Sequence, residues 1–160
     1  MFTQNDLRQV MRRWPSGVAI LTASDGLTTH GLSVNSFTSV SIDPEMVTVT
    51  LANTTRAKRI VDSTGLFAIN LLPETQAELS DVFAGKIPEH ADRFAGVETT
   101  PGLTQVPLLK AASAHVECRV VHTYEMPHST LYVAEVLHAE KNADAPPLVY
   151  FNREYHRIQQ

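Results

Sequence analysis

A close succession of short strand-like segments constrains this fold more than any other feature of the sequence. Apolar and polar residues alternate along residues 46–51, and residues 66–72 are typical of a buried strand. The pair Asp25-Gly26 predicts a hairpin turn. Further strand signals lie at residues 18–21, 28–34, 36–42, 114–120, 130–139 and 148–151. About eight short strands that mostly follow one another predict a mainly β protein, a β-barrel or β-sandwich with short helical insertions, and disfavour a parallel doubly wound sheet.

Three helical patterns interrupt these strand signals. Their predicted N-terminal caps are Thr3 with Asp6, Thr54 or Thr55, and Thr75 with Glu78. Pro15 and Gly17 are expected to end the first helix, and Gly65 the second. Residues 84–110 contain several glycines and prolines and are predicted to be irregular. No change of composition divides the chain, so we expect a single domain over residues 1–160.

Composition disfavours several classes of partner. The formal net charge is −4, and no basic stripe of the kind that binds nucleic acid is visible. No apolar run approaches the ~18–20 residues that cross a membrane, and the N-terminus lacks the layout of a secretory signal. The only cysteine, Cys118, cannot form an internal disulfide. We therefore expect a cytoplasmic protein that binds neither nucleic acid nor membrane.

Common catalytic motifs are missing from the sequence. It contains neither the glycine-rich dinucleotide motif nor the phosphate-binding loop with its lysine, and it has no Gly-x-Ser-x-Gly elbow. The seven histidines are scattered, so no metal site is predicted. Cys118 falls on the apolar face of its strand, where a free cysteine behaves as a small hydrophobic residue.

Two segments concentrate uncharged hydrogen-bonding residues. Along residues 31–41, serine, threonine and asparagine either face water or form a polar wall for the edge of a heterocycle. Residues 51–58 place hydroxyls at the start of a helix, with Arg56 and Lys58 in its first turn. Cations at the start of a helix interact unfavourably with the helix dipole, and an anion bound to the exposed N–H groups would explain their presence. The alternative is a solvated basic turn. Together the segments suggest one ligand with a flat polar ring and a phosphate tail.

Several motifs occur in an order that is specific, although no single one is diagnostic. The strongest covers residues 31–41, Gly-Leu-Ser-Val-Asn-Ser-Phe-Thr-Ser-Val-Ser, with Asp43-Pro44 after it. The others are residues 10–22, 67–72, 92–96, 107–109, 117–120 and 147–150. In these motifs the chain resembles the short-chain flavin reductase family over nearly its whole length. The resemblance implies the FMN-binding split β-barrel, a Greek-key-like fold.

The same resemblance implies a homodimeric oxidoreductase that transfers a hydride from NADH or NADPH to FMN, FAD or riboflavin. Members of the family usually deliver the reduced flavin to a separate monooxygenase. The cofactors supply the hydride chemistry themselves, so the protein needs only to orient two rings. No catalytic acid, base or nucleophile is therefore expected.

The binding residues of the family correspond to three stretches of this sequence. Those expected to face the isoalloxazine ring are Ser33, Val34, Asn35 and Ser36. Those expected to hold the ring edge and the phosphate are Leu51, Ala52, Asn53, Thr54, Thr55 and Arg56. Phe83 and Ala84 resemble residues that close over the flavin.

Two further residues are assigned to the nicotinamide side by the same resemblance. His128 matches a histidine that the family places near the nicotinamide. Met126-Pro127 precede it where the family usually has Gly-Asp, a departure that bears on the choice between NADH and NADPH. Tyr155 is a candidate for the same pocket.

Two alternatives remain open at this point. One is an enzyme of the same fold that retains its flavin and reduces another acceptor. The other is a non-enzymatic module that binds flavin or haem. In that module the candidate haem ligands are His115, His122 and His138, although their positions in strands favour ordinary surface residues.

Overall fold

The computed structural model describes residues 3–86 and 92–158 of the 160-residue chain. Its helices are α1 (Gln4–Met11), α2 (Arg56–Thr64), the 3-10 turn η1 (Glu74–Gln76) and α3 (Ala77–Phe83). Its strands are β1 (Ser16–Gly17), β2 (Ala19–Ser24), β3 (Thr29–Val34), β4 (Thr38–Ile42), β5 (Glu45–Ala52), β6 (Leu66–Leu71), β7 (Thr99–Pro101), β8 (Pro107–Leu109), β9 (Ala114–Glu125), β10 (Ser129–Lys141), β11 (Val149–Phe151) and β12 (Glu154–His156). Within the described residues, no helix has the length and apolar character needed to cross a membrane.

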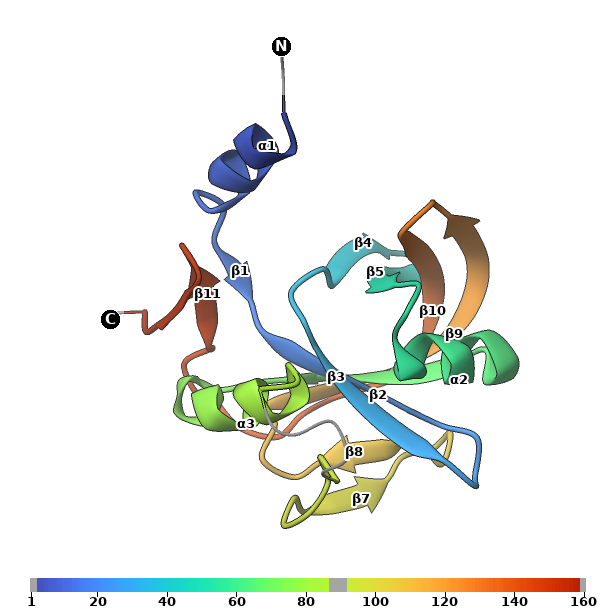
Figure 1. Ribbon diagram of the computed structural model, residues 1–160. Helices are drawn as coiled ribbons and strands as arrows, with labels where there is room; N and C mark the ends of the chain where they lie inside the picture. The colour runs from blue at the N-terminus through green and yellow to red at the C-terminus, as the bar shows by residue number, and fades with distance from the viewer. Residues whose placement is uncertain (1–2, 87–91, 159–160) are drawn as a thin grey trace.

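Seven antiparallel strands form the central sheet, in the order β3-β2-β6-β9-β10-β5-β4. Its two edge strands, β3 and β4, are consecutive in the chain, and only residues 35–37 separate them. Figure 1 shows β3 leading directly toward β4, which lies beside β5. Among the described residues no ladder joins β3 to β4, so the sheet is not a closed barrel. The structure confirms a mainly β fold with short helices, and the gap between the edge strands agrees with the expected split barrel.

Two small sheets complete the structure. Strands β1, β11 and β12 form one of them, and β7 pairs with β8 to form the other. The prediction that residues 84–110 are irregular is therefore wrong for the two segments 99–101 and 107–109. Each of these strands is only three residues long, too short to show an alternating pattern. Strand β12 was not expected either.

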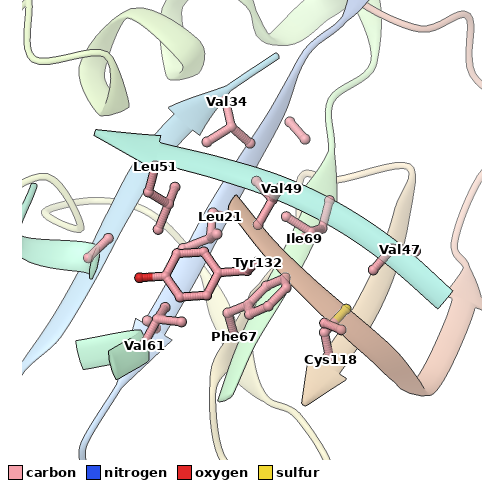
Figure 2. Close-up of a cluster of buried hydrophobic side chains, with 14 of the residues drawn as sticks. Leu21, Val34, Val47, Val49, Leu51, Val61, Phe67, Ile69, Cys118 and Tyr132 are labelled. Carbon is pink, nitrogen blue, oxygen red and sulfur yellow. The ribbon is translucent and has the colours of Figure 1, made fainter. Parts of the chain in front are cut away.

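The main core lies between the central sheet and α2. Figure 2 shows its buried side chains, with the Tyr132 ring of β10 among them. Val47, Val49 and Leu51 all point into this core, as the alternation along residues 46–51 predicts. Cys118 is completely buried in the same cluster, and burial raises the pKa of its thiol to about 12. Its prediction as a small hydrophobic residue is confirmed.

The first two helices begin as the sequence predicts. Thr3 and Asp6 form a reciprocal capping box at the start of α1. Thr55, rather than Thr54, caps α2. Gly65 ends α2 in the left-handed conformation, with φ of 68°. Helix α1 ends at Met11, somewhat earlier than expected.

The third predicted cap is wrong. Thr75 lies inside the 3-10 turn η1, whose Gln76 N–H donates to the carbonyl of Pro73. Helix α3 begins only at Ala77, and its N-cap residue makes no side-chain hydrogen bond. The spacing of Thr75 and Glu78 is that of a capping box. However, Thr75 lies within the tighter turn that starts at Pro73, so it does not cap α3.

The first part of β9 is covered on its outer face rather than exposed. His115 is buried, and its Nε2 lies 2.8 Å from the carbonyl oxygen of Leu109 in β8. The expectation that His115 is an ordinary surface residue is therefore wrong. The hairpin of β7 and β8 packs over β9, a contact between distant segments that the local pattern could not show. No group of three potential metal ligands occurs among the residues that the structure describes.

Candidate functional site

A cavity of about 180 Å³ lies where the end of β3 meets α3, β11 and β12. The residues singled out from the sequence that line it are Ser33, Val34, Asn35, Ala84 and Tyr155. The lining residues that sequence reasoning missed are Val18, Ser80, Lys86 and Tyr150. Four segments that are far apart in the sequence therefore contribute to one cavity with a mixed polar and aromatic wall.

Hydroxyl groups on three elements form a chain of hydrogen bonds along this wall. Ser33 Oγ donates to the carbonyl oxygen of Ser80 at 2.6 Å and lies 3.1 Å from Ser80 Oγ. The hydroxyl of Tyr155 lies 2.9 Å from Ser80 Oγ and 2.8 Å from Oδ1 of Asp81. Because a carboxylate can only accept, Tyr155 donates to Asp81 and accepts from Ser80. The chain fixes the orientation of β3, α3 and β12 relative to one another.

An ion pair at the edge of the cavity holds this chain in place. Lys86 Nζ lies 2.7 Å from Asp81 Oδ1, and 5.6 Å from the centre of the Tyr155 ring. The hydrogen bond from Lys86 lowers the pKa of the Asp81 carboxyl, and the same bond raises the pKa of Lys86. Burial and the bond to Asp81 raise the pKa of Tyr155, whose hydroxyl therefore stays neutral.

Residues 33–36 differ in what they present to a ligand. Val34 is buried in the core. Asn35 is exposed, and its amide makes no hydrogen bond with any described residue, so it is available to a ligand. Ser36 instead bonds to β5, because its Oγ donates to the carbonyl oxygen of Thr50 and accepts from the N–H of the same residue. It ties the segment between the edge strands to the end of β5.

A second group gathers at the turn between β5 and α2. The side-chain amide of Asn53 donates to the carbonyl oxygen of Met126, and its Oδ1 accepts from Thr130 Oγ1 at 2.8 Å. The backbone N–H of Asn53 donates to the carbonyl oxygen of His128. Asn53 and His128, which the sequence assigned to different parts of the ligand, are thus neighbours in the structure. Ala52 and Thr54 are exposed in the same turn.

The start of α2 carries positive potential. Arg56 is exposed in its first turn, next to the Thr55 cap. Partial burial, together with the charges of Arg93 and Arg56, lowers the pKa of His30 on β3. The effect of both guanidinium groups on one histidine shows that they act on the same region. An anion at the start of α2 would be stabilised by that potential and by the helix dipole.

Two of the residues assigned to the flavin point into the protein. Leu51 is buried in the main core. Phe83 is fully buried and packs edge to face on Phe94, with ring centroids 5.1 Å apart. A Cβ atom on Gly31 would lie only 2.3 Å from the Phe83 ring, so glycine is required at that position. The roles predicted for Leu51 and Phe83 at the ligand remain predictions.

The chemistry of the cavity fits a flavin ring. Neutral donors and acceptors, from Asn35, Ser80 and Tyr155, match the amide-like edge of a heterocycle, and the Tyr150 ring adds an apolar surface. The phosphate of a flavin nucleotide has candidate partners in Lys86 and in the start of α2. Ser80 could have been found from the sequence, because it lies one helical turn before Phe83 and Ala84.

Comparison with known proteins gives a consistent result. A family model described as "Flavin reductase like domain" matches residues 11–159. The chain is 37% identical to the actinorhodin polyketide dimerase of Streptomyces coelicolor, over 95% of this chain and 85% of that protein. It is 32% identical to the NADH-dependent FMN reductase RutF of Stutzerimonas stutzeri, over 97% of this chain and 88% of that protein.

A solved structure shows the same similarity. The flavin reductase of the styrene monooxygenase from Pseudomonas putida superposes with a TM-score of 0.84 at 30% sequence identity. The match covers 96% of this chain and 98% of that chain.

Proposed function

Because the chain belongs to the flavin reductase-like domain family, we propose that it transfers a hydride from NADH or NADPH to FMN, FAD or riboflavin. It is proposed to release the reduced flavin to a partner monooxygenase, in line with the name of the similar Pseudomonas putida protein, the flavin reductase of a styrene monooxygenase. The observation that carries the proposal is the cavity between β3, α3 and β12, with its neutral polar wall and exposed Asn35 amide. No proton donor is required for the hydride itself.

The chain's own residues bind and orient the ligand. When bound, flavin supplies the hydride-accepting chemistry. Asn35 offers a donor and an acceptor to the ring edge, and Tyr155 is held by Asp81 with its ring against the cavity. Arg56 and the N–H groups at the start of α2 neutralise the phosphate. His128, which lies beside Asn53, is proposed to contact the nicotinamide.

The decisive experiment measures NADH and NADPH oxidation by absorbance, with and without FMN, FAD and riboflavin. We expect turnover that depends on added flavin, and a preference for one nicotinamide. Turnover without added flavin would contradict the release of reduced flavin. No oxidation with any of the three flavins would overturn the proposed activity.

Similarity to a polyketide dimerase favours a second candidate function. The protein would then retain its flavin and act on another acceptor. It would be yellow when purified. Added riboflavin would be reduced by NADH or NADPH no faster with the protein than without it. The same assay therefore separates the two candidates.

We also propose that the protein is a homodimer in the cytoplasm. Exposed apolar side chains support a dimer: Val40 and Ile42 on β4 are 56% and 79% exposed, and Val121 and Tyr124 on β9 are also exposed. Analytical ultracentrifugation of the wild type and of Ile42→Asp tests this, since the charge is expected to shift the protein toward monomer. The single buried cysteine fits a reducing compartment.

A further inference from the structure

A second space of about 180 Å³ lies next to the cavity of the candidate functional site. We call it the apolar pocket. It is enclosed by the start of β2, the end of β3, the end of β6 and the segment that leads into β11. Val18 and Val34 line both spaces, so these two side chains form a shared wall. The apolar pocket therefore adjoins the flavin cavity without being part of it.

Main-chain hydrogen bonds fix the walls of the apolar pocket. The N–H of Val18 donates to the carbonyl oxygen of Leu148, and the N–H of Leu148 donates to that of Leu72. The N–H of Leu72 in turn donates to the carbonyl oxygen of Val18. The side chains of all three residues are buried. The pocket is therefore preformed, and it offers a ligand mainly apolar surface.

One polar side chain, that of Ser113, lines the apolar pocket. Its Oγ donates to the carbonyl oxygen of Leu71 at 3.1 Å, and no described residue donates to Ser113 Oγ in return. A serine hydroxyl can accept hydrogen bonds through its oxygen while it donates one. A single hydroxyl group on a ligand therefore has an acceptor inside the pocket.

The volume of the apolar pocket corresponds to one six-membered ring, because an apolar cavity of about 150 Å³ is enough to hold benzene. Phe37 lines the pocket from the connection between β3 and β4, and its half-buried ring offers an aromatic contact. None of the described residues around the pocket is charged. This wall disfavours an anion or a nucleotide and favours a small aromatic ring that carries one hydroxyl.

Gly17 leaves space free at the apolar pocket, which it lines from β1. A Cβ atom added at Gly17 would meet no heavy atom within 4 Å, and its φ is not in the left-handed region. Neither crowding nor backbone conformation therefore requires glycine at this position. A larger residue would extend into free space. The absence of a side chain here supports a pocket that is kept open for a ligand.

We propose that the apolar pocket binds a monocyclic phenol, and that its occupancy tightens flavin binding in the neighbouring cavity. The ring packs against Phe37 and the buried aliphatic side chains, and the hydroxyl donates to Ser113 Oγ. The bound ring also holds Val18 and Val34 in place, so less ordering remains when flavin binds on their other side. Binding of the phenol stands by itself, whereas its effect on flavin rests on the proposed function.

Titration of the flavin-free protein with phenol tests the site directly. Leu72 and Leu148 line the apolar pocket but not the flavin cavity, so their methyl NMR signals report on the pocket alone. We expect these signals to shift and to saturate, and saturating riboflavin to leave the phenol bound. If the signals do not shift, or if riboflavin displaces the phenol, the proposal is overturned.

Two variants separate the ring from the hydroxyl. Ser113→Ala is expected to weaken phenol binding about tenfold and to leave toluene binding unchanged, because toluene has no hydroxyl. Ser63→Ala is the matched control, since Ser63 also donates to a main-chain carbonyl but lies on α2 outside the pocket. Gly17→Leu is expected to abolish binding of both compounds without lowering Tm. Equal losses in the two serine variants, or full binding by Gly17→Leu, would contradict the assignment.

The effect on flavin is measured as the Kd for riboflavin with and without saturating phenol. We expect phenol to lower this Kd about fivefold, and riboflavin to lower the Kd for phenol by the same factor. An unchanged Kd for riboflavin would overturn the proposed coupling. If riboflavin does not bind at all, the proposed function fails, while the phenol titration still decides whether the apolar pocket is a binding site.

Discussion

The carboxylate of Glu117 lies directly against Gly102, where a Cβ atom would fall only 2.5 Å from Oε2. This close approach lets Oε1 accept from the N–H of Leu103, and Oε2 accept from the N–H and hydroxyl of Thr104. Glu117 is only 1% exposed, so a charged group on the outer face of β9 is completely enclosed by the loop between β7 and β8. The contribution of Glu117 to the stability of the fold comes from these three hydrogen bonds.

Glu117→Gln is expected to destabilise the protein by about 1.5–3 kcal/mol, the usual range for hydrogen bonds to a charged group. Burial raises the pKa of Glu117, but the bonds from Thr104 and Leu103 more than offset this effect and lower it. The stabilisation is therefore present above the ordinary glutamate pKa and is lost as pH falls through the lowered value. Urea denaturation across this pH range measures both effects. Glu98→Gln, at an exposed ion pair, is the control and should change stability by less than about 0.5 kcal/mol.

Arg153→Gly is expected to stabilise the fold by about 1 kcal/mol, because glycine adopts the left-handed conformation of the turn between β11 and β12 without steric cost. Thermal unfolding should show a higher Tm. Arg153→Ala removes the same guanidinium but keeps the backbone strain, so it should not stabilise the protein. A stabilised Arg153→Ala variant would contradict this explanation.

Lys86→Met is expected to raise the pKa of Asp81 toward its ordinary value, since the hydrogen bond from Lys86 is the main cause of its lowering. NMR titration of the side-chain carboxyl measures the change. Lys110→Met, which removes a lysine paired with Glu98, is a control for the loss of one positive charge. An unchanged Asp81 pKa in Lys86→Met would show that other groups hold the carboxylate.

Asn35→Leu is expected to raise KM for riboflavin by about tenfold, because an apolar side chain cannot replace the hydrogen bonds of the amide to the ring edge. Riboflavin is used because it has no phosphate. The exposed neighbour Thr38, on β4 outside the cavity, provides the control variant Thr38→Leu. Equal effects of the two substitutions would place the ring elsewhere.

Arg56→Ala is expected to raise KM for FMN about tenfold and to leave KM for riboflavin unchanged, because the guanidinium is assigned to the phosphate. Arg59→Ala, an exposed residue of the same helix, controls for the general loss of charge. If FMN and riboflavin were affected alike, the assignment of the phosphate to this turn would be wrong.

Local patterns predicted the parts of the fold in which neighbouring residues decide the structure. Alternation along residues 46–51 identified β5 and its buried face, and Asp25-Gly26 identified the hairpin of β2 and β3. The concentration of uncharged polar residues along residues 31–41 identified residues 33–35, which line the cavity. In each case a short-range rule of burial or turn geometry determines the outcome.

Contacts between residues far apart in the sequence could not be predicted from local patterns. Tyr155 meets Asp81 across 74 positions of the sequence, and Ser33 meets Ser80 across 47. Helical spacing places Ser80 one turn before Phe83 and Ala84, but it does not show which distant strands α3 meets. The loop that joins β7 to β8 is likewise held by Glu117, which belongs to β9 in the central sheet.

The break in the central sheet falls between two strands that follow each other in the chain, and Asn35 lies in the short connection that spans it. An insertion or deletion in this connection would resize the mouth of the cavity without disturbing any strand ladder. The same strand framework would then accept hydride acceptors of different sizes. The range of substrates would change while the free energy of unfolding stayed the same.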